Sequence, residues 1–409
     1  MGEVAVRVTS RRWRLEGRFA GCCLRMSRAH ARLRVMNDNI VIPVAPRRRY
    51  SEEPTVVSLY AGCGGLDIGF RWAGFCPVWV NDVDPVALET YAGVLPGHRV
   101  VAGDIMRVRE RRGPKEADIV IGGPPCQGFS VAGRMNPEDP RSRHVWTFLE
   151  VVEAVRPRAF VMENVKALAT NRRWAELRKR LVERAKSLGF ESRMYLLNAA
   201  DFGVPQARER MFLIGLRTGE GAHVPPAGDT AISHPTLRSA LERLPQWGEP
   251  GNDSICPAKI TLARTPVLRR SPWAGMLFNG AGRPMDLDRP APTLPASMGG
   301  NKTPIIDQEQ LEYGADPWVV RYHAHLWGGG KPWNEAPSRL RRITVEEAAA
   351  IQSFPHGMKW SGSLSARFRQ IGNAVPPELA YRVALALRES LGLDRGTSID
   401  RPMDLLGAV

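Results

Sequence analysis

The decisive stretch of this sequence is Ile121-Gly122-Gly123-Pro124-Pro125-Cys126-Gln127-Gly128-Phe129-Ser130. The apolar run that leads into it, from Asp118 to Ile121, predicts a buried parallel strand that stops at two glycines and two prolines. Proline fixes its own φ and keeps the preceding residue extended, so Cys126 is expected to be held rigidly at the carboxyl end of this strand. Ligands of open α/β sheets bind at that edge. Taken alone, the stretch leaves two interpretations open, a nucleophilic thiol and an ordinary buried cysteine.

The strands predicted before this stretch also end in residues suited to binding. Residues 55–60 predict a strand that leads into a glycine turn and a helix, and the turn contains Gly62, Gly64 and Gly65. These glycines predict a tight turn that lets a ligand lie against the backbone. Their spacing differs from G-x-G-x-x-G, so the phosphate-binding site of dinucleotide enzymes is not expected. Strands at 77–81 and 99–101 are followed by Asp82 and Asp104. One such aspartate is often only a helix cap, but three strand ends in register favour a ligand site.

The strands predicted after it add a carboxylate and two arginines. Residues 159–162 form an apolar run that leads directly into Glu163, where desolvation should raise the carboxyl pKa and suit it to acid catalysis. Two more strands are predicted at 192–197 and 211–216. Between them, Arg208 and Arg210 alternate and would point the same way in an extended chain, although a solvated basic turn is the plain alternative.

Other stretches predict connecting structure. The polar segment 128–146 predicts a lid over the site. The spacing of Trp174, Leu177, Leu181, Val182, Ala185 and Leu188 predicts a helix whose apolar side lies in the core and which ends at Gly189.

Composition narrows the class of protein. The chain has 409 residues, 43% of them hydrophobic, with no apolar run long enough to cross a membrane and no signal peptide. Six cysteines without a CxxC pair favour reduced thiols in the cytoplasm and no metal site. The formal charge of +15 points to a polyanionic partner, but residues 1–50 alone carry +9, which leaves +6 for the rest.

The chain divides into five predicted parts. Residues 1–53 predict a basic, disordered arm, unless translation starts at Met26 or Met36. Residues 54–216 predict the catalytic domain, and 217–338 a separate domain rich in loops, prolines and glycines. Residues 339–393 recover order, with a helix capped by Thr344 and Glu347, and 394–409 predict a frayed tail.

Taken together, these motifs resemble those of the DNA (cytosine-5)-methyltransferases of bacterial type. Tyr60 to Gly65 resembles the family's first motif, and Pro124-Pro125-Cys126-Gln127, Glu163-Asn164-Val165 and Gln206-x-Arg208-x-Arg210 match its three catalytic motifs. Arg342 to Pro355 resembles the ninth motif, with Glu346 where arginine is common, and Gly372 to Pro376 the last one. The resemblance implies a Rossmann-like S-adenosylmethionine-dependent methyltransferase fold, α/β with a mostly parallel seven-stranded sheet, and a smaller target-recognition domain at 217–338.

The resemblance also implies the roles of individual residues. Cys126 would be the nucleophile, Glu163 would bind the amino group and ring nitrogen of the base, Arg210 its carbonyl oxygen, and Arg208 would lie near the phosphate or the thiolate. S-adenosyl-L-methionine would be bound by a further set of residues: Tyr60, Gly62, Gly64, Gly65, Asp82, Val83, Asp104, Ile105, Pro125, Asn373 and Val375. DNA would be contacted by Ser130, Arg141, Gln206, Thr293 and Leu294.

The implied substrate is a cytosine flipped out of double-stranded DNA, since the reaction cannot occur inside a stacked duplex. A bacterial, nucleoid-associated monomer without a metal is expected, paired in function with a restriction endonuclease. The alternatives are a tRNA cytosine-5 methyltransferase, a catalytically inactive DNA-binding relative, and a nicotinamide dehydrogenase. The long segment 217–338 argues against the tRNA enzyme, and the intact catalytic motifs argue against an inactive relative. The missing third glycine of the turn argues against the dehydrogenase.

Overall fold

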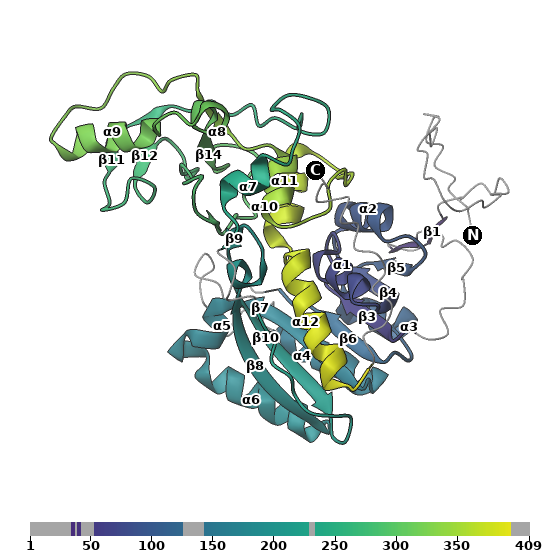
Figure 1. Ribbon diagram of the computed structural model, residues 1–409. Helices are drawn as coiled ribbons and strands as arrows, with labels where there is room; N and C mark the ends of the chain where they lie inside the picture. The colour runs from purple at the N-terminus through teal and green to yellow at the C-terminus, as the bar shows by residue number, and fades with distance from the viewer. Residues whose placement is uncertain (1–33, 37–38, 42–52, 126–142, 229–233, 394–409) are drawn as a thin grey trace. The chain divides into compact units, whose positions relative to one another are not determined.

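A computed structural model of the chain describes residues 34–36, 39–41, 53–125, 143–228 and 234–393 (Figure 1). Within these residues the fold is α/β with a mostly parallel sheet, as the sequence predicts. Cys126, Ser130 and Arg141 lie outside the described residues, as does most of the predicted lid.

The described residues form one large sheet of nine strands in the order β1-β2-β5-β4-β3-β6-β7-β10-β8. Its members are β1 (Arg34–Met36), β2 (Asn39–Val41), β3 (Thr55–Leu59), β4 (Cys76–Asp82), β5 (Arg99–Ala102), β6 (Ile119–Gly122), β7 (Ala159–Val165), β8 (Phe190–Asn198) and β10 (Glu209–Arg217). The five central strands β5, β4, β3, β6 and β7 are parallel, while β10 pairs antiparallel with both β7 and β8. All seven predicted strands are therefore confirmed.

Two details of the predicted sheet are wrong. Residues 34–36 and 39–41, assigned to a disordered arm, form a hairpin that extends the sheet through Val41 and Val101. Strands of three residues are too short to show an alternating pattern, so they could not be predicted from the sequence. The other detail concerns β7, which continues through Glu163 to Val165 because β10 pairs with it along its whole length.

Alternating side chains of β3 supply two separate cores. Val57 points to the face covered by α3 (Ile105–Arg112), α4 (His144–Val155) and α6 (Ala175–Ser187), and Val56 to the face covered by α1 (Gly65–Trp72) and α12 (Pro377–Ser390). This period of two is the geometry of a strand buried on both faces. The predicted helix at 174–188 is thus confirmed as α6 preceded by the short helix η2 (Arg172–Trp174). Val182, however, is 38% exposed and does not belong to the core.

The segment after β10 builds smaller units. Its described elements are α7 (Leu237–Leu241), β11 (Leu262–Val267), β12 (Met276–Phe278), β13 (Ala291–Pro292), β14 (Ile305–Asp307), α8 (Gln308–Tyr313), α9 (Trp318–Trp327) and β15 (Leu340–Arg342). The side chains of Trp318 and Tyr322 on α9 stack on each other and pack with Phe278 of β12 in a core of their own. Residues 260–342 therefore hold a hydrophobic core distinct from those of the large sheet.

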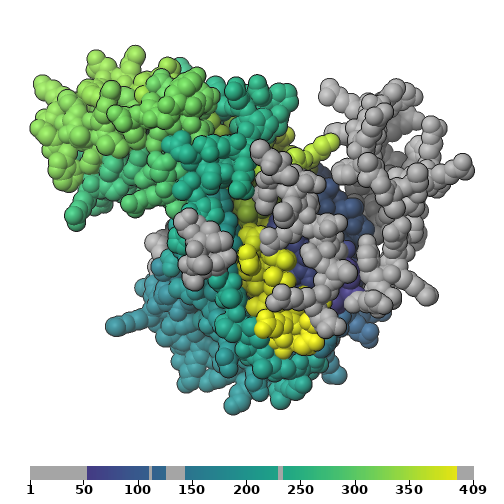
Figure 2. Space-filling model, viewed as in Figure 1, coloured from purple at the N-terminus to yellow at the C-terminus, as the bar shows by residue number. Residues whose placement is uncertain are grey.

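The last part of the chain returns to the first. Helices α10 (Val345–Ile351), α11 (Leu364–Asn373) and α12 follow β15, and the predicted capping box of Thr344 and Glu347 is present at the start of α10. Helix α12 packs on α1, where a methyl group at Gly69 would come within 2.4 Å of the backbone nitrogen of Tyr381 (Figures 1 and 2, yellow). Glycine is required there because the two helices touch backbone to backbone.

The remaining elements link these strands. They are α2 (Pro85–Val94), α5 (Lys166–Thr170), η3 (Ala199–Phe202) and β9 (Gln206–Ala207). Strand β9 pairs in parallel with β13, which joins the two predicted domains through main-chain hydrogen bonds. Among the described residues no helix is both long and apolar enough to cross a membrane.

Candidate active site

The carboxyl ends of the parallel strands bring the predicted residues to one edge of the sheet. Strand β3 ends before the glycine turn, β4 in Asp82, β6 before the Pro-Pro pair and β7 beyond Glu163. Because neighbouring parallel strands are in register, these ends form one continuous site.

The glycine turn is held by Asp82. One carboxylate oxygen of Asp82, Oδ2, accepts a hydrogen bond from the backbone nitrogen of Gly62 at 2.8 Å, and Oδ1 accepts one from that of Asp84 at 2.8 Å. Burial raises the pKa of Asp82, while these backbone hydrogen bonds work in the opposite direction. Asp82 therefore holds the glycine turn in place, whereas the sequence predicted only a contact between Asp82 and the cofactor.

The turn itself leaves room for a ligand. Gly62 and Gly64 have φ angles of 55° and 91°, and no atom lies within 4 Å of where a side chain of Gly62 would begin. Tyr60 also has a positive φ of 56°, rare for a residue with a side chain, and its hydroxyl lies 3.1 Å from Nδ1 of His144. A methyl group on Gly65 would lie 2.3 Å from the carbonyl oxygen of Val375.

The other predicted cofactor residues differ in what they can offer. The side chain of Val83 is 69% exposed beside the turn, as a residue covering a flat ring would be. Asp104 caps α3 by accepting from the nitrogen of Met106 at 3.0 Å through Oδ1, and Ile105 is buried, so only its backbone remains for a ligand. Asn373 is exposed at the end of α11, whereas the side chain of Val375 is buried. An open glycine turn flanked by carboxylates suits the amino acid and ribose portions of S-adenosylmethionine.

The centre of the site is an ion pair between Glu163 and Arg210. Arg210 Nε lies 3.0 Å from Glu163 Oε1, and the side chains of Arg210 and Glu163 are only 14% and 12% exposed, respectively. Burial raises the pKa of Glu163, and the positive charge of Arg210, followed by that of Arg208, acts against the rise. The net effect is a raised pKa, so the protonated carboxyl group persists to higher pH than in an exposed glutamate.

The same carboxyl group lies against the backbone that leads to Cys126. A side chain on Gly123 would begin 2.9 Å from Glu163 Oε2, so only glycine fits between them. Asn164 Nδ2 donates to the carbonyl oxygen of Pro124 at 3.2 Å. These contacts hold the Pro-Pro segment, whose last described residue is Pro125, beside Glu163.

Arg208 occupies a different environment from Arg210. It is 1% exposed, and its Nη2 donates to the carbonyl oxygens of Gly372 and Ala374, each at 2.9 Å, while Nη1 donates to that of Leu294 at 3.4 Å. Its guanidinium group therefore joins the residue between β9 and β10 to the end of α11 and to the loop after β13. Arg208 is expected to lie near the phosphate or the thiolate. Its burial does not agree with a phosphate contact, the thiolate of Cys126 lies outside the described residues, and we assign Arg208 a positioning role.

Two residues expected to contact DNA are buried. Leu294 is 1% exposed in a hydrophobic core, and Gln206 is fully buried, with neither atom of its amide bonded to any described residue. Neither side chain can reach DNA as the chain is arranged here. Thr293 is exposed, and its hydroxyl donates to the carbonyl oxygen of Ala207 at 2.9 Å. The Thr-Leu pair thus connects the two domains.

Sequence reasoning missed a buried carboxyl group beneath the glycine turn. Asp67 is fully buried in the first turn of α1, where Oδ2 accepts from Ser58 at 2.9 Å and Oδ1 from Tyr91 at 3.1 Å. Burial raises the pKa of Asp67 to about 7. The position of Asp67 among apolar residues of the predicted helix could have indicated that its carboxyl group is buried.

Glu346, which departs from the family pattern, has a structural role. Its Oε1 accepts from the hydroxyl of Ser254 at 2.6 Å and its Oε2 from the backbone nitrogen of the same residue at 3.2 Å. Glu346 therefore holds the segment that follows α7 against the start of α10.

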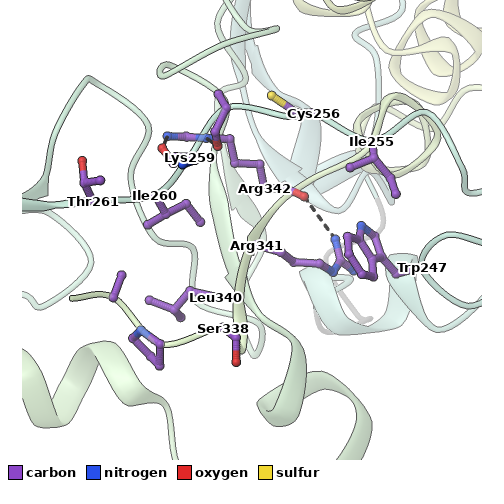
Figure 3. A pocket seen from close by; sticks show the side chains of 13 residues that line it. Trp247, Ile255, Cys256, Lys259, Ile260, Thr261, Ser338, Leu340, Arg341 and Arg342 are labelled. Carbon is purple, nitrogen blue, oxygen red and sulfur yellow. Dashed lines mark hydrogen bonds between the residues drawn. The ribbon is translucent and has the colours of Figure 1, made fainter.

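A separate cavity of about 320 Å³ lies beside β15 (Figure 3). Trp247 and Ile255 line it, and the guanidinium group of Arg341 lies 5.4 Å from the centre of the Trp247 ring. Arg341 is itself bound to Glu347 through both terminal nitrogens, at 2.8 and 2.6 Å. The cavity contains none of the residues at the catalytic edge. The described residues hold no cluster of side chains suited to a metal ion.

Comparison with known proteins decides the family. Residues 54–389 match the family model of the C-5 cytosine-specific DNA methylases. The chain belongs to this family. It is a DNA cytosine-5 methyltransferase, in agreement with the resemblance seen in its motifs.

Individual relatives support the assignment. The Type II methyltransferase M1.HphI of Haemophilus parahaemolyticus is 31% identical over 355 residues, covering 83% of this chain and 87% of that protein. M.NgoPII of Neisseria gonorrhoeae is 30% identical, covering 82% and 96% of the two chains. A DNA modification methyltransferase encoded within an Escherichia coli prophage has the same fold at a TM-score of 0.58 and 21% identity, covering 83% of this methyltransferase and 100% of that chain.

Proposed function

We propose that this methyltransferase transfers the methyl group of S-adenosyl-L-methionine to carbon 5 of a flipped cytosine through a covalent bond to Cys126. The observation that carries the proposal is the buried pair of Glu163 and Arg210, which lies against Gly123, three residues before the cysteine. The bound sulfonium supplies an electrophilic methyl group. The open turn at Gly62 and the exposed Val83 would hold this cofactor, with Asp104 at the adjacent strand end.

The residues of the site have complementary roles. The thiolate of Cys126 would add to carbon 6 of the ring and move an electron pair to carbon 5, the atom that would take up the methyl group supplied by bound S-adenosyl-L-methionine. Glu163, in its protonated form, donates to the ring nitrogen and stabilises the charge, and Arg210 neutralises the carbonyl oxygen. Removal of the proton on carbon 5 then expels the thiolate.

A trapping experiment tests the nucleophile. The probe is a mixed-sequence duplex in which 5-fluorocytosine replaces every cytosine, so that the recognised sequence need not be known. Fluorine cannot leave as a proton does, and the wild-type protein with cofactor should form an adduct that survives denaturing electrophoresis. Cys126→Ala should form none, and Cys256→Ala, which changes a buried cysteine outside the site, should form it normally. An adduct with Cys126→Ala would move the nucleophile elsewhere.

We also propose that the protein acts as the modification enzyme of a restriction system, as the names of its Type II relatives indicate for them. Methylome sequencing of DNA from cells that express the protein would report the sequence it modifies. Methyl transfer to tRNA with none to duplex DNA would instead favour the RNA-modifying alternative.

A further inference from the structure

A pair of hydrogen-bonded rings joins the glycine turn to the start of helix α4. The hydroxyl of Tyr60 lies 3.1 Å from Nδ1 of His144 and 3.3 Å from the carbonyl oxygen of the same residue. The two rings meet edge to face, with their centres 5.5 Å apart and their planes at 89°. Both residues are half-buried. His144 is the first residue of α4 and has no part in the mechanism proposed above.

His144 lies at the carboxyl edge of the sheet, as the glycine turn does. Helix α4 ends shortly before β7 begins at the amino edge, and β7 runs parallel to β6, so the first residue of α4 is at the opposite edge. Helix α3, which begins after Asp104, is joined to α4 by the ion pair of Arg109 and Glu150. The pair of Tyr60 and His144 therefore lies among the strand ends that carry the predicted cofactor residues.

Both rings are uncharged near neutral pH. Burial lowers the pKa of His144, against the effect of the negative charge of Asp104, and burial raises the pKa of Tyr60 well above that of an ordinary tyrosine. The phenol has one proton and can donate it to one acceptor only. When Nδ1 carries the imidazole proton, it donates to the phenol oxygen while the hydroxyl donates to the carbonyl oxygen of His144. Both contacts are then satisfied.

Tyr60 requires such contacts because its backbone is strained. Its φ of 56° lies in the left-handed region, which is unfavourable for a residue with a side chain and persists only where the surroundings hold it. The backbone that follows is held by Asp82 of β4 through Gly62, and the side chain is held by His144 of α4. Without the second contact the turn would populate other conformations, and a ligand that binds one conformation would bind more weakly.

We propose that His144 is a positioning residue for the cofactor: through the hydroxyl of Tyr60 it holds the glycine turn in the conformation that binds S-adenosyl-L-methionine. The inference rests on the proposed function for the identity of the cofactor, but it does not depend on the role of Cys126. The effect is on the affinity for the cofactor, and the rate of methyl transfer from bound cofactor is unchanged.

The test is a double-mutant cycle in the full chain, with binding of S-adenosyl-L-methionine measured by isothermal titration calorimetry. Tyr60→Phe removes only the hydroxyl, and His144→Phe removes both ring nitrogens but keeps a ring. Each should raise the Kd of the cofactor roughly fivefold, as the loss of one hydrogen bond does. The double variant should raise it no further, because both changes remove the same interaction. In all three, kcat at saturating cofactor should match the wild type.

Two further variants separate positioning from a loss of folding. His144→Asn, whose amide can occupy the place of Nδ1, should restore most of the affinity. Tyr195→Phe is the matched control, because the hydroxyl of Tyr195 on β8 is buried without a hydrogen-bond partner among the described residues, and it should leave Kd unchanged. Tyr60→Phe and His144→Asn still give the comparison if His144→Phe does not fold.

An unchanged Kd in Tyr60→Phe, even with a lower Tm, would overturn the proposal. So would increases in Kd that multiply in the double variant, since these would show that the two side chains act independently. A wild-type protein that binds no cofactor would overturn the proposed function together with this inference. Failure of the fluorocytosine trap with the cycle intact would count against the covalent mechanism alone.

Discussion

At the scale of single residues, two arginines only two positions apart do different work. Arg210 meets the carboxylate of Glu163, and Arg208 binds three carbonyl oxygens from segments that are 86, 164 and 166 positions away in the chain. The alternation of residues along a strand predicts that Arg208 and Arg210 lie on the same side of it. It cannot predict which residues from other parts of the chain pack against that side. The role of Arg208 depends on long-range contacts and was therefore not predictable from the local pattern.

Replacing Arg208 should affect folding more than the replacement of Arg210. Arg208→Ala leaves the carbonyl groups of Leu294, Gly372 and Ala374 unpaired in the interior, at a cost of about 3 kcal/mol or more. We expect a clear fall in Tm by calorimetry, with Arg208→Lys intermediate. Arg210→Ala should lower the rate of methyl transfer at a smaller change in Tm. The opposite ranking would return Arg208 to a role in substrate contact.

Glu163→Gln should lower the single-turnover rate of methyl transfer about 10²- to 10⁴-fold while the protein stays folded. Burial raises the pKa of Glu163, so its protonated form persists to higher pH than in an ordinary glutamate. The wild-type rate should therefore decline as pH rises through that pKa, and the glutamine variant should lack this decline. An identical pH profile in both proteins would show that another group titrates.

At the scale of elements, the start of α1 combines an open turn with a buried acid. Asp67 lies two residues after Gly65, and Ser58 of β3 and Tyr91 of α2 donate to its two oxygens. The carboxyl group thus joins three elements beneath the cofactor turn.

The buried Asp67 should make stability depend on pH. Its pKa is raised from 3.8 to about 7 by burial, so the native state binds a proton that the unfolded chain releases between these values. The free energy of unfolding should therefore fall as pH rises from about 4 to about 7. Urea unfolding at several pH values would measure this, and Asp67→Asn should flatten the slope. A slope unchanged by the substitution would assign the effect to other groups.

Two glycine substitutions test the packing of α1 on α12. Gly69→Ala would place a methyl group 2.4 Å from the backbone nitrogen of Tyr381 and should lower Tm and weaken cofactor binding, since α12 directly follows the last motif, whose Val375 lies against the turn. Gly93→Ala in α2 meets no atom within 4 Å and should be neutral or stabilising, by up to about 1 kcal/mol. Calorimetry and cofactor titration measure both. Equal effects would mean that the helix contact is not the cause.

At the scale of the whole molecule, much of the fold could be predicted from the sequence. Hydrophobic runs and glycine turns in the sequence predicted all seven strands. They also predicted that Glu163 lies at the catalytic edge of the sheet. The hairpin at 34–41, the burial of Leu294 and Gln206, and the role of Arg208 could not be predicted, because each is decided by partners distant in sequence. Site residues that act through local motifs were the predictable ones.

Removal of residues 1–32 tests the partition of charge across the molecule. These residues carry eight arginines against two glutamates and lie before β1, so the deletion removes a net charge of +6 and leaves the described sheet complete. We expect weaker binding of mixed-sequence DNA at low salt and a smaller salt slope, with an unchanged rate at saturating DNA. A large fall in that rate would indicate that the segment takes part in catalysis.

The contact of Val375 with the start of α1 has a consequence for biosynthesis. The carbonyl of Val375 closes against Gly65, so more than three hundred residues separate the two sides of one small-molecule site. A ribosome must complete almost the entire polypeptide before that site exists. A newly made chain would then gain its ability to modify the genome at a single late moment of translation, and prematurely terminated products would be inert.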